Sequence, residues 1–292
     1  MKRLSGKPVR EALVERLQKE VQLYTSKGLR APSLAVILVG ENPASQTYVK
    51  NKRDLCERIG FMHFDYSFCE DTSEAEILAL IDELNGRKDV DGILVQLPLP
   101  SHISEEAVIN RISPEKDVDG FSPYNVGLLS QGQDSFIPCT PYGIMEMLKF
   151  YDIPTVGQRV CVIGRSNIVG KPMAMLMMRK GIDSTVTVCN TKTKDLKSVT
   201  LSSDIVIVAT GVPGTIDSSY VRDGAVVIDV GVNRIPDSTR EKGFRLVGDA
   251  DYESFKDRDV AITPVPGGVG IMTVTMLMAN TMKSYRGRMT QL

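Results

Sequence analysis

The chain has 292 residues, of which 42% are hydrophobic and 24% charged, and its formal net charge is −1. This length and composition suit two globular domains and exclude a disordered or fibrous chain. The near-neutral charge gives no basic field for nucleic acid or a membrane surface. Five cysteines without C-x-x-C spacing argue for a reducing compartment and against a disulfide framework or a zinc site. We therefore expect a cytoplasmic protein.

The first half of the chain alternates helix and strand patterns. The run LAVILVG (34–40) is typical of a strand buried on both faces. Asn42 can cap a helix whose first position suits Pro43. The predicted elements are a helix over 8–27, a strand over 34–40, a helix from Pro43, a strand over 63–68, a helix over 73–85, a strand within 91–100 that Pro98 and Pro100 stop, and a helix over 104–112. This alternation predicts a parallel α/β layer.

A second series of elements begins near residue 140. It comprises a helix over 140–151, strands over 159–164, 185–190, 204–211 and 225–233, a further segment over 260–268, and a helix over 273–289. We therefore predict an α/β protein with a first domain over 1–139 and a Rossmann-like dinucleotide-binding domain over 140–270. The C-terminal helix, within 271–292, is expected to pack back on the first domain.

The stretch VCVIGRSNIVGKPMAMLMM is the candidate phosphate-binding segment. A buried strand ends at Gly164, a turn follows, and an apolar helix begins near Val169. Gly164 can make the turn, Ser166 is small enough to let backbone N–H groups face a pyrophosphate, and the helix dipole favours an anion. The spacing Gly164-x-Ser166-x-x-x-Gly170 departs from G-x-G-x-x-G, so an ordinary strand-to-helix turn is the alternative.

The end of the next strand discriminates between dinucleotides. An NAD site needs Asp or Glu about 20 residues after the glycine turn, whereas this strand ends in Asn190, Thr191 and Lys192. Together with Arg165 in the turn, these side chains would suit a 2′-phosphate. The sequence therefore favours NADP, and a solvated basic loop is the alternative.

Two further strands break at glycine, in ATGVPG (209–214) and IDVGVN (228–233). The carboxyl ends of parallel strands line the ligand crevice of a doubly wound sheet, which makes Gly211, Gly231 and Val232 candidate neighbours of the dinucleotide. Simple strand-end turns explain the same residues equally well.

The segment YVKNKRDLCERIGF (48–61) holds a lysine on an apolar helix face. At roughly 100° per residue, one stripe about 100° wide contains Tyr48, Lys52, Leu55, Cys56 and Ile59. Lys50 lies outside this stripe. Lys52 either snorkels to water or projects into a cleft in which its pKa falls. In the second case Tyr48, one turn earlier, could orient it.

Three other segments could contribute polar groups to the same place. Gln96 ends a buried strand, where an amide needs a partner or a ligand. Asp119 lies in KDVDGF, where Asp–Gly is also ordinary turn chemistry. The loop TPVPGGVG (263–270) is either a rigid crossing between domains or a wall against a planar ligand.

Taken together, these segments resemble the bifunctional methylenetetrahydrofolate dehydrogenase/cyclohydrolase family. The matching stretches are NPASQTYVKNK, GILVQLPLP, KDVDGF, PCTPYGIMEML, GRSNIVGKPMAML, DVGVNR, VGD and TPVPGGVG. The resemblance implies two domains facing a cleft, with folate on the first and NADP on the second, and a homodimer. It also implies oxidation of 5,10-methylenetetrahydrofolate and hydrolysis of the methenyl product to 10-formyltetrahydrofolate, within one-carbon metabolism for purine and amino-acid biosynthesis.

The resemblance also implies roles for individual residues, and no metal. Lys52 would be the catalytic lysine, Tyr48 would orient it or stack on the folate, Gln96 would support Lys52, and Asp119 would bind the pterin edge. The implied folate contacts are Tyr48, Gln96, Leu97, Pro98, Asp119, Pro264, Pro266, Gly267, Gly268 and Ile271, within a pocket lined by residues 266–274. The implied NADP contacts are Gly164, Arg165, Ser166, Ile168, Val169, Asn190, Thr191, Lys192, Gly211 and Val232.

The chain departs from the family pattern at three positions. Asn190 and Ser122 stand where histidine is common, and Ile271 replaces a proline. The departure at Asn190 leaves the contact to the cofactor phosphate open, and the departure at Ile271 concerns the folate loop and the start of the last helix.

Two other functions fit parts of the sequence. A two-domain amino-acid or shikimate dehydrogenase would share the architecture and the glycine turn, but not Tyr48, Lys52 and VQLPLP. A folate- or nucleotide-binding sensor would fit every binding motif, but it gives no role to a lysine on an apolar stripe.

Overall fold

The computed structural model describes residues 1–240 and 243–289, which form two compact units. Unit 1 contains Met1–Arg10 and Thr140–Thr273. Unit 2 contains Glu11–Cys139 and the described part of the chain from Val274. Among the described residues, no helix combines the length and the apolar character that a membrane crossing requires.

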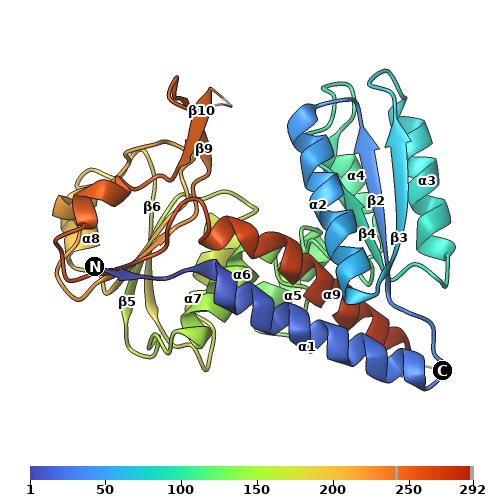
Figure 1. Ribbon diagram of the computed structural model, residues 1–292, viewed down its shortest axis with the longest axis horizontal. Coiled ribbons are helices and arrows are strands. Elements are labelled where there is room, and N and C mark those ends of the chain that lie inside the picture. The colour runs from blue at the N-terminus through green and yellow to red at the C-terminus, as the bar shows by residue number, and fades with distance from the viewer. Residues whose placement is uncertain (241–242, 290–292) are drawn as a thin grey trace. The chain divides into compact units, whose positions relative to one another are not determined.

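Unit 2 is an α/β layer built on a three-stranded parallel sheet of order β3-β2-β4 (Figure 1). Its elements are α1 (Gly6–Ser26, whose first turn belongs to unit 1), β2 (Ser33–Val39), α2 (Pro43–Ile59), β3 (Met62–Phe68), α3 (Glu74–Gly86), β4 (Gly92–Val95), α4 (Glu105–Arg111), α5 (Pro123–Ser130) and α9 (Thr273–Met289). The predicted alternation is confirmed, but the strand expected over 91–100 ends at Val95, and α5 was not predicted.

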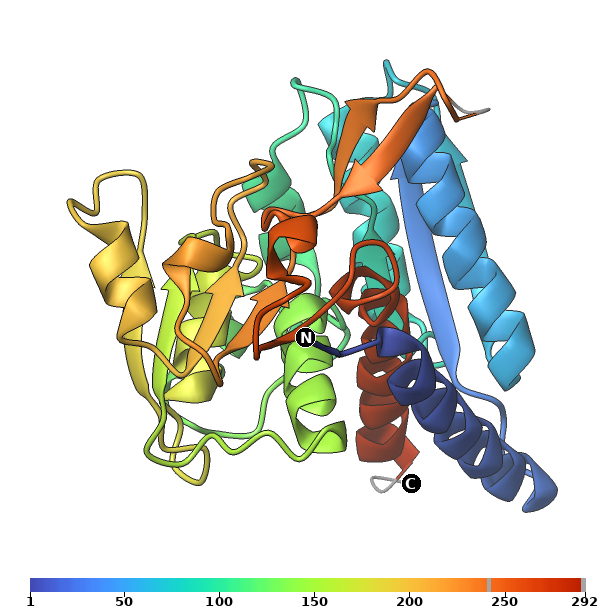
Figure 2. The same ribbon diagram turned by 60° about the vertical axis from the view of Figure 1, so that its left-hand side comes forward.

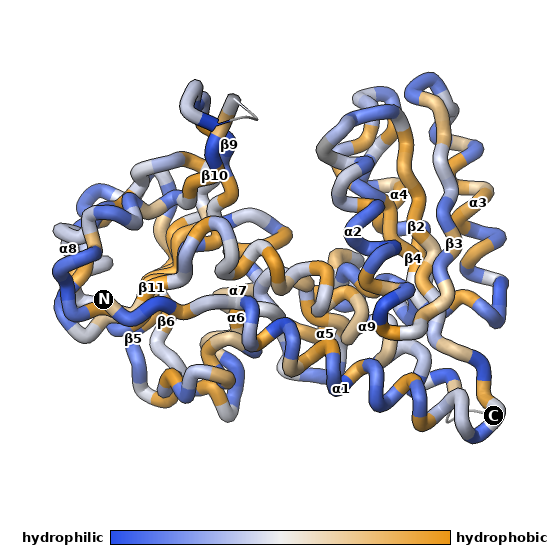
Figure 3. Tube along the Cα trace, viewed as in Figure 1, coloured by the Kyte–Doolittle hydropathy of each residue, from blue (hydrophilic) through white to orange (hydrophobic). Residues whose placement is uncertain are grey.

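The core of unit 2 lies on both faces of β2, every residue of which is buried. One face of β2, with Ala35, Ile37 and Val39, packs with apolar side chains of α3 and α4. Helix α2 contacts β2 and β3, and the apolar residues of its stripe are buried. Figure 3 shows this arrangement as hydrophobic central strands beside a largely hydrophilic α2.

Helix α9 packs within unit 2, although it comes from the end of the chain. The Ser284 hydroxyl donates to the carbonyls of Asp91 and Glu115 at 2.7 and 2.8 Å, and the buried Tyr285 ring meets Tyr24 of α1 edge-on. Figures 1 and 2 show α9 and α1 side by side. The helix spans Thr273–Met289, which confirms the predicted element, and residues 290–292 of the wider segment 271–292 lie outside the described residues.

Unit 1 contains a six-stranded, all-parallel sheet of order β1-β11-β8-β7-β5-β6. Its strands and α-helices are β1 (Lys2–Arg3), α6 (Cys139–Phe150), β5 (Arg159–Ile163), α7 (Gly170–Met177), β6 (Thr185–Cys189), α8 (Leu196–Leu201), β7 (Ile205–Val208), β8 (Val226–Asp229), β9 (Asn233–Pro236), β10 (Phe244–Val247) and β11 (Ala261–Ile262). Strands β6 and β7 flank β5 on opposite sides, so the strand order reverses at β5. This is the place where doubly wound sheets bind ligands.

Two features of unit 1 differ from the sequence prediction. Residues 1–10 were assigned to the first domain, but β1 joins the unit 1 sheet because Lys2 N and Leu4 N donate to the carbonyls of Val260 and Ile262 at 2.7 and 2.8 Å. In addition, β9 and β10 form an antiparallel hairpin beyond the parallel sheet (Figures 1 and 2).

Lys116 closes the C-terminal end of α3 and gives the fold a testable contact. Its ammonium donates to the carbonyls of Leu84, Asn85 and Arg87 at 2.7, 2.9 and 2.6 Å. Helix C-termini carry unpaired carbonyls and partial negative charge, which a cation satisfies. We expect Lys116→Met to lower the free energy of unfolding in urea by about 2 kcal/mol. KDVDG occurs twice, at 88–92 and 116–120, and the exposed Lys88 begins the first copy as Lys116 begins the second. Lys88→Met is therefore the control, and equal midpoints for Lys116→Met and Lys88→Met would contradict the assignment.

Candidate active site

Lys52 lies on the buried side of α2, as the helix wheel predicted. It is 8% exposed, among the buried Leu55, Cys56 and Ile59, whereas Lys50 is exposed. The Asn42 side chain accepts from Ser45 N at 3.3 Å, which caps the helix as expected. Tyr48, which the wheel places in the same stripe, is 50% exposed.

The Lys52 ammonium is held by the end of β4. Its Nζ donates to Gln96 Oε1 at 2.7 Å, and Gln96 Nε2 donates to the Leu97 carbonyl at 2.7 Å. The second bond fixes the amide so that its oxygen faces the lysine. Gln96 N also donates to Ile37 O at 2.8 Å, which continues the sheet ladder to this residue. The peptide bond between Leu97 and Pro98 is cis.

Asp119 and Cys139 complete the charged neighbourhood of Lys52. Burial lowers the pKa of Lys52, and the Asp119 carboxylate opposes that effect. Burial likewise raises the pKa of Asp119 to about 6, against the opposing influence of Lys52. The Cys139 thiol lies 3.7 Å from Asp119 Oδ1, and burial raises its pKa well above the usual range. The site thus holds an amine and a carboxyl that both favour neutrality more than they do in water.

The turn that carries Asp119 is fixed from its C-terminal side by the start of α5. The buried Asp117 carboxylate accepts from the backbone N–H of Ser122 and from the Asn125 amide at 2.8 and 2.9 Å. Ser122 is the N-cap of α5, because its hydroxyl accepts from Asn125 N, and Pro123 follows at the first helical position. The departure at Ser122 therefore has a structural role.

The predicted phosphate-binding turn occupies the carboxyl end of β5. Gly164 has φ 120°, and a Cβ there would lie 2.2 Å from the Ala209 carbonyl oxygen. A Cβ at Gly170 would lie 2.2 Å from Gly164 O, so both glycines are required by close packing. The Ser166 hydroxyl accepts from Val169 N at 3.1 Å. Arg165 and Ile168 are exposed beside the start of α7.

The loop after β6 is turned by Asn190. Its side-chain oxygen accepts from Lys192 N at 2.9 Å, and Thr193 Oγ1 accepts from Asn190 N at 3.0 Å. Thr191 and Lys192 are exposed. Asn190 thus shapes the loop, which leaves the cationic and hydroxyl side chains of its neighbours directed to the surface.

The ends of β7 and β8 are organised by a buried aspartate that the sequence did not reveal. Asp249 Oδ2 accepts from Thr210 N and Gly211 N at 2.7 and 2.9 Å. A Cβ at Gly231 would lie 2.0 Å from Asp249 Oδ1, so Gly231 is needed to admit this carboxylate. Val232, one residue on, is 48% exposed. Gly231 is therefore required by packing, whereas Gly211 has open space around it and a positive φ of 69°.

The loop over 263–271 belongs to unit 1. A Cβ at Gly268 would lie 2.5 Å from Pro264 O, and the peptide bond between Val265 and Pro266 is cis. A cavity of 610 Å³ is lined by Arg3, Ser5, Lys7, Pro266, Gly267 and Ile271. Ile271, the departure from proline, lies in a short 3₁₀ helix, Val269–Ile271, against Gly6.

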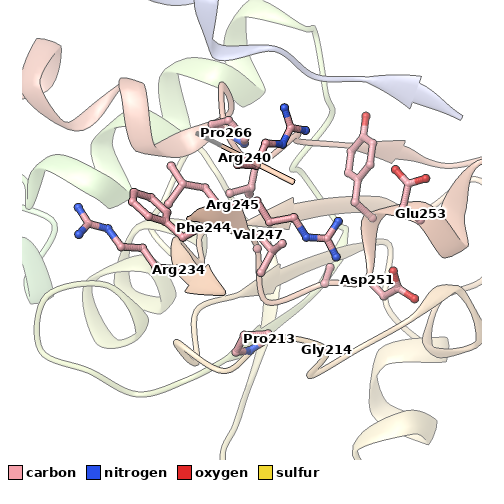
Figure 4. Close-up of a pocket in the computed structure, with 15 residues that line it drawn as sticks. Pro213, Gly214, Arg234, Arg240, Phe244, Arg245, Val247, Asp251, Glu253 and Pro266 are labelled. Carbon is pink, nitrogen blue, oxygen red and sulfur yellow. The ribbon is translucent and has the colours of Figure 1, made fainter. Parts of the chain in front are cut away.

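A second cavity of unit 1, of 910 Å³, lies beside the β9–β10 hairpin. Figure 4 shows Arg234, Arg240 and Arg245 around it, with Phe244 and Pro266. Of the residues predicted to bind folate or NADP, Pro266 alone is in this lining. Within the described part of the chain, no cluster of three or more His, Cys, Asp or Glu side chains is placed to hold a metal ion.

The predicted site residues therefore form two groups. Unit 2 brings together Lys52, Gln96, Leu97 and Asp119, with Tyr48 and Pro98 exposed nearby along the same elements. Unit 1 holds the glycine turn, the Asn190 loop, the ends of β7 and β8, and the 263–271 loop. Cys139 and Asp249 were not among the predicted site residues. Cys139 lies in the quoted PCTP stretch and Asp249 in VGD, so those motifs were the available signal.

Comparisons with known proteins match two domains of one family to successive parts of the chain. Residues 4–119 match the tetrahydrofolate dehydrogenase/cyclohydrolase catalytic domain, and residues 138–289 match the NAD(P)-binding domain of the same family. The bifunctional protein FolD of Aquifex aeolicus is 50% identical over 290 residues, which cover 99% of this chain and 97% of that protein.

Solved structures show the same relationship. FolD of Campylobacter jejuni has a TM-score of 0.93 and 47% identity, with 99% of each chain covered. The Trypanosoma brucei enzyme, solved with NADP cofactor and inhibitor, has a TM-score of 0.91 and 37% identity, with 97% of this chain and 96% of that chain covered. These matches extend over both units, which decides between this family and the other two-domain dehydrogenases. The chain belongs to the tetrahydrofolate dehydrogenase/cyclohydrolase family.

Proposed function

We propose that this protein oxidises 5,10-methylenetetrahydrofolate to the 5,10-methenyl compound with NADP and hydrolyses that product to 10-formyltetrahydrofolate. The observation that carries the proposal is the buried Lys52 amine, 2.7 Å from an oriented Gln96 oxygen and beside Asp119. A sensor that only bound folate would gain nothing from burying an amine whose charge is disfavoured there.

Unit 2 would bind the pterin end of the folate. The exposed ring of Tyr48 offers a face for stacking, and Asp119 offers oxygen atoms to the N–H groups of a pterin. Leu97 and Pro98 would supply apolar contact next to Gln96. In unit 1, Pro264, Pro266, Gly267, Gly268 and Ile271 would line the remainder of the substrate site.

The glycine turn of unit 1 fits a dinucleotide. It stands at the reversal of strand order, its backbone between Gly164 and Val169 leads into α7, and Ser166 and Ile168 are exposed. Arg165, Thr191 and Lys192 would hold a 2′-phosphate, with Asn190, Gly211 and Val232 lining the site. When bound, NADP supplies the hydride acceptor. The protein's part in that step is to align the reacting carbon with it.

The hydrolysis needs proton transfer by the protein. Water adds to the cationic methenyl carbon and loses one proton, which gives a neutral carbinol. A proton then reaches N5, the bond from that carbon to N5 breaks, and the hydroxyl proton passes to solvent, which leaves the formyl group on N10. Neutral Lys52 can accept the first proton and deliver it to N5, because its lowered pKa makes both steps accessible. Gln96 keeps the amine in place through its carbonyl oxygen.

The dehydrogenase is tested by the absorbance at 340 nm in the presence of methylenetetrahydrofolate and NADP. We expect a steady rise with NADP and a slower one with NAD. The absence of any rise with either dinucleotide would contradict the proposed function.

Cofactor choice is tested at Arg165. Loss of a charge-assisted hydrogen bond costs about 1.5–3 kcal/mol, so Arg165→Ala should reduce the preference of kcat/KM for NADP over NAD by about 10- to 100-fold. The exposed Lys180, beyond the other end of α7, provides the control Lys180→Ala. An unchanged preference in Arg165→Ala would refute this assignment.

The finer biological setting is also a proposal. Five free cysteines support a reducing, cytoplasmic compartment, and membership of the family supports a homodimer. Production of 10-formyltetrahydrofolate would place the enzyme in one-carbon metabolism, which feeds purine and amino-acid biosynthesis.

A further inference from the structure

The turn that carries Asp119 is clamped from a second side, by α9. Asn280 is 1% exposed, and its Nδ2 donates to the carbonyls of Val118 and Ile137, both at 2.8 Å. The first carbonyl belongs to the peptide that joins Val118 to Asp119. The second lies two residues before Cys139, whose thiol meets Asp119 Oδ1. One amide thus uses both of its hydrogens to tie together the segments that hold the carboxyl group.

The two segments also pack closely against each other. Gly120 has φ 72°, and a Cβ there would lie 2.8 Å from the Phe136 carbonyl oxygen and 3.0 Å from Pro138 N. Cys139 Sγ lies 3.7 Å from the Val118 carbonyl as well as from Asp119 Oδ1. The turn is therefore in close contact with residues 136–139, and Asn280 bonds to the carbonyls of both segments.

Burial of the Asn280 amide at this position costs free energy unless its polar atoms are hydrogen-bonded. Asn280 lies among the buried Met276, Leu277, Ala279 and Met282 of α9, and Thr281 and Ser284 are buried polar neighbours on the same helix. A buried amide without partners costs free energy, and an apolar side chain would pack here without needing any. Val118 O and Ile137 O, however, would then be left without these bonds.

We infer that Asn280 is a positioning residue, which sets the place of the Asp119 carboxyl toward the pterin by holding the Val118 and Ile137 carbonyls. This inference rests on the proposed function and adds to it a residue from the far end of the chain. A displacement of about 1 Å at a substrate contact can cost up to 100-fold in rate, so the effect is measurable even when the fold persists.

The test is a double-mutant cycle between Asn280→Ala and Asp119→Asn. We expect Asn280→Ala to raise KM for methylenetetrahydrofolate about tenfold and to leave KM for NADP unchanged. In the Asp119→Asn background, Asn280→Ala should cost almost nothing further, because both changes remove the same contact. Additive effects in the cycle, or equal changes in both KM values, would overturn the inference.

The controls separate positioning from stability. Thr281 is buried on the same helix, and its hydroxyl donates within α9 to Leu277 O at 2.9 Å. Thr281→Val should therefore leave both KM values unchanged. If Asn280→Ala does not fold, the isosteric Asn280→Asp takes its place, and failure of both to fold would assign Asn280 to the core instead and overturn the inference. Inactivity of the unchanged protein would contradict the proposed function; activity with an additive cycle would contradict only the role of Asn280.

Discussion

Replacement of Lys52 by methionine is expected to lower the hydrolysis of preformed methenyltetrahydrofolate by about 100-fold or more. General acid–base groups contribute about 10²–10⁴-fold, and Lys52 is the amine that Gln96 holds at 2.7 Å. The dehydrogenase should lose less, because hydride transfer depends on alignment and moves no proton through Lys52. Rates of both reactions, measured on one preparation, give the ratio that checks this split.

The Lys52→Met variant is expected to fold, so a loss of hydrolysis would not come from unfolding. Lys52 is 8% exposed, and an apolar chain of similar length removes a desolvated amine without creating a cavity. The midpoint of thermal unfolding of Lys52→Met should therefore be at or above that of the unchanged protein. The exposed Lys50 on the same helix supplies Lys50→Met, for which both activities should be unchanged. Hydrolysis by Lys52→Met at the parental rate would show that another group carries the proton.

The pH dependence of hydrolysis follows from the same residue. A lowered pKa means that Lys52 gives up its proton below the ordinary lysine value of about 10.4. The neutral amine is the form that accepts a proton from water, so the enzymatic rate should rise with pH through the lowered pKa and then level off. After subtraction of the uncatalysed reaction, Lys52→Met should lack this rise.

Residues of the site differ in how far the sequence could reveal them. Lys52 was singled out by helical periodicity, because a charge within an apolar stripe is visible from the sequence alone. Gln96 was identified as a polar residue at the end of a buried strand, and the structure places its oxygen on Lys52. Asn280 gave no such signal. Its partners are backbone carbonyls of Val118 and Ile137, far away along the chain, and a polar residue in a C-terminal helix is ordinarily solvated.

The fold shows the same distinction between periodic and non-periodic segments. The buried strands β2, β5, β7 and β8 have continuous apolar runs, and they were predicted within a few residues of their bounds. Helix α5 was missed because it has eight residues, PYNVGLLS, with little periodicity. The pairing of β1 with β11 was missed because two residues, Lys2–Arg3, carry no strand pattern, and only the distant edge of the sheet makes them a strand.

Gly164→Ala is expected to destabilise unit 1 strongly. The effect should exceed that of an alanine at a glycine that also has positive φ but has open space around its Cβ position. At φ 120° an alanine is strained by about 1–2 kcal/mol, and its Cβ would also lie 2.2 Å from Ala209 O. Ala209 is held in place, because its N–H donates to Ile163 O at 2.8 Å and so extends the ladder between β5 and β7. With about 1–3 kcal/mol for overpacking, the free energy of unfolding should fall by about 2–5 kcal/mol.

The contribution of the steric contact can be isolated by comparison with Gly157. Its φ is 73°, and among the described residues nothing lies within 4 Å of a Cβ built there. Gly157→Ala therefore suffers only the backbone strain, and the difference between the two variants in urea unfolding measures the contact with Ala209. If Gly164→Ala still folds, displacement of the turn should also weaken NADP binding, which titration of the protein with the dinucleotide would report. Equal unfolding midpoints for the two variants would mean that β5 and β7 can separate at the turn, and the close packing assigned to Gly164 would then be wrong.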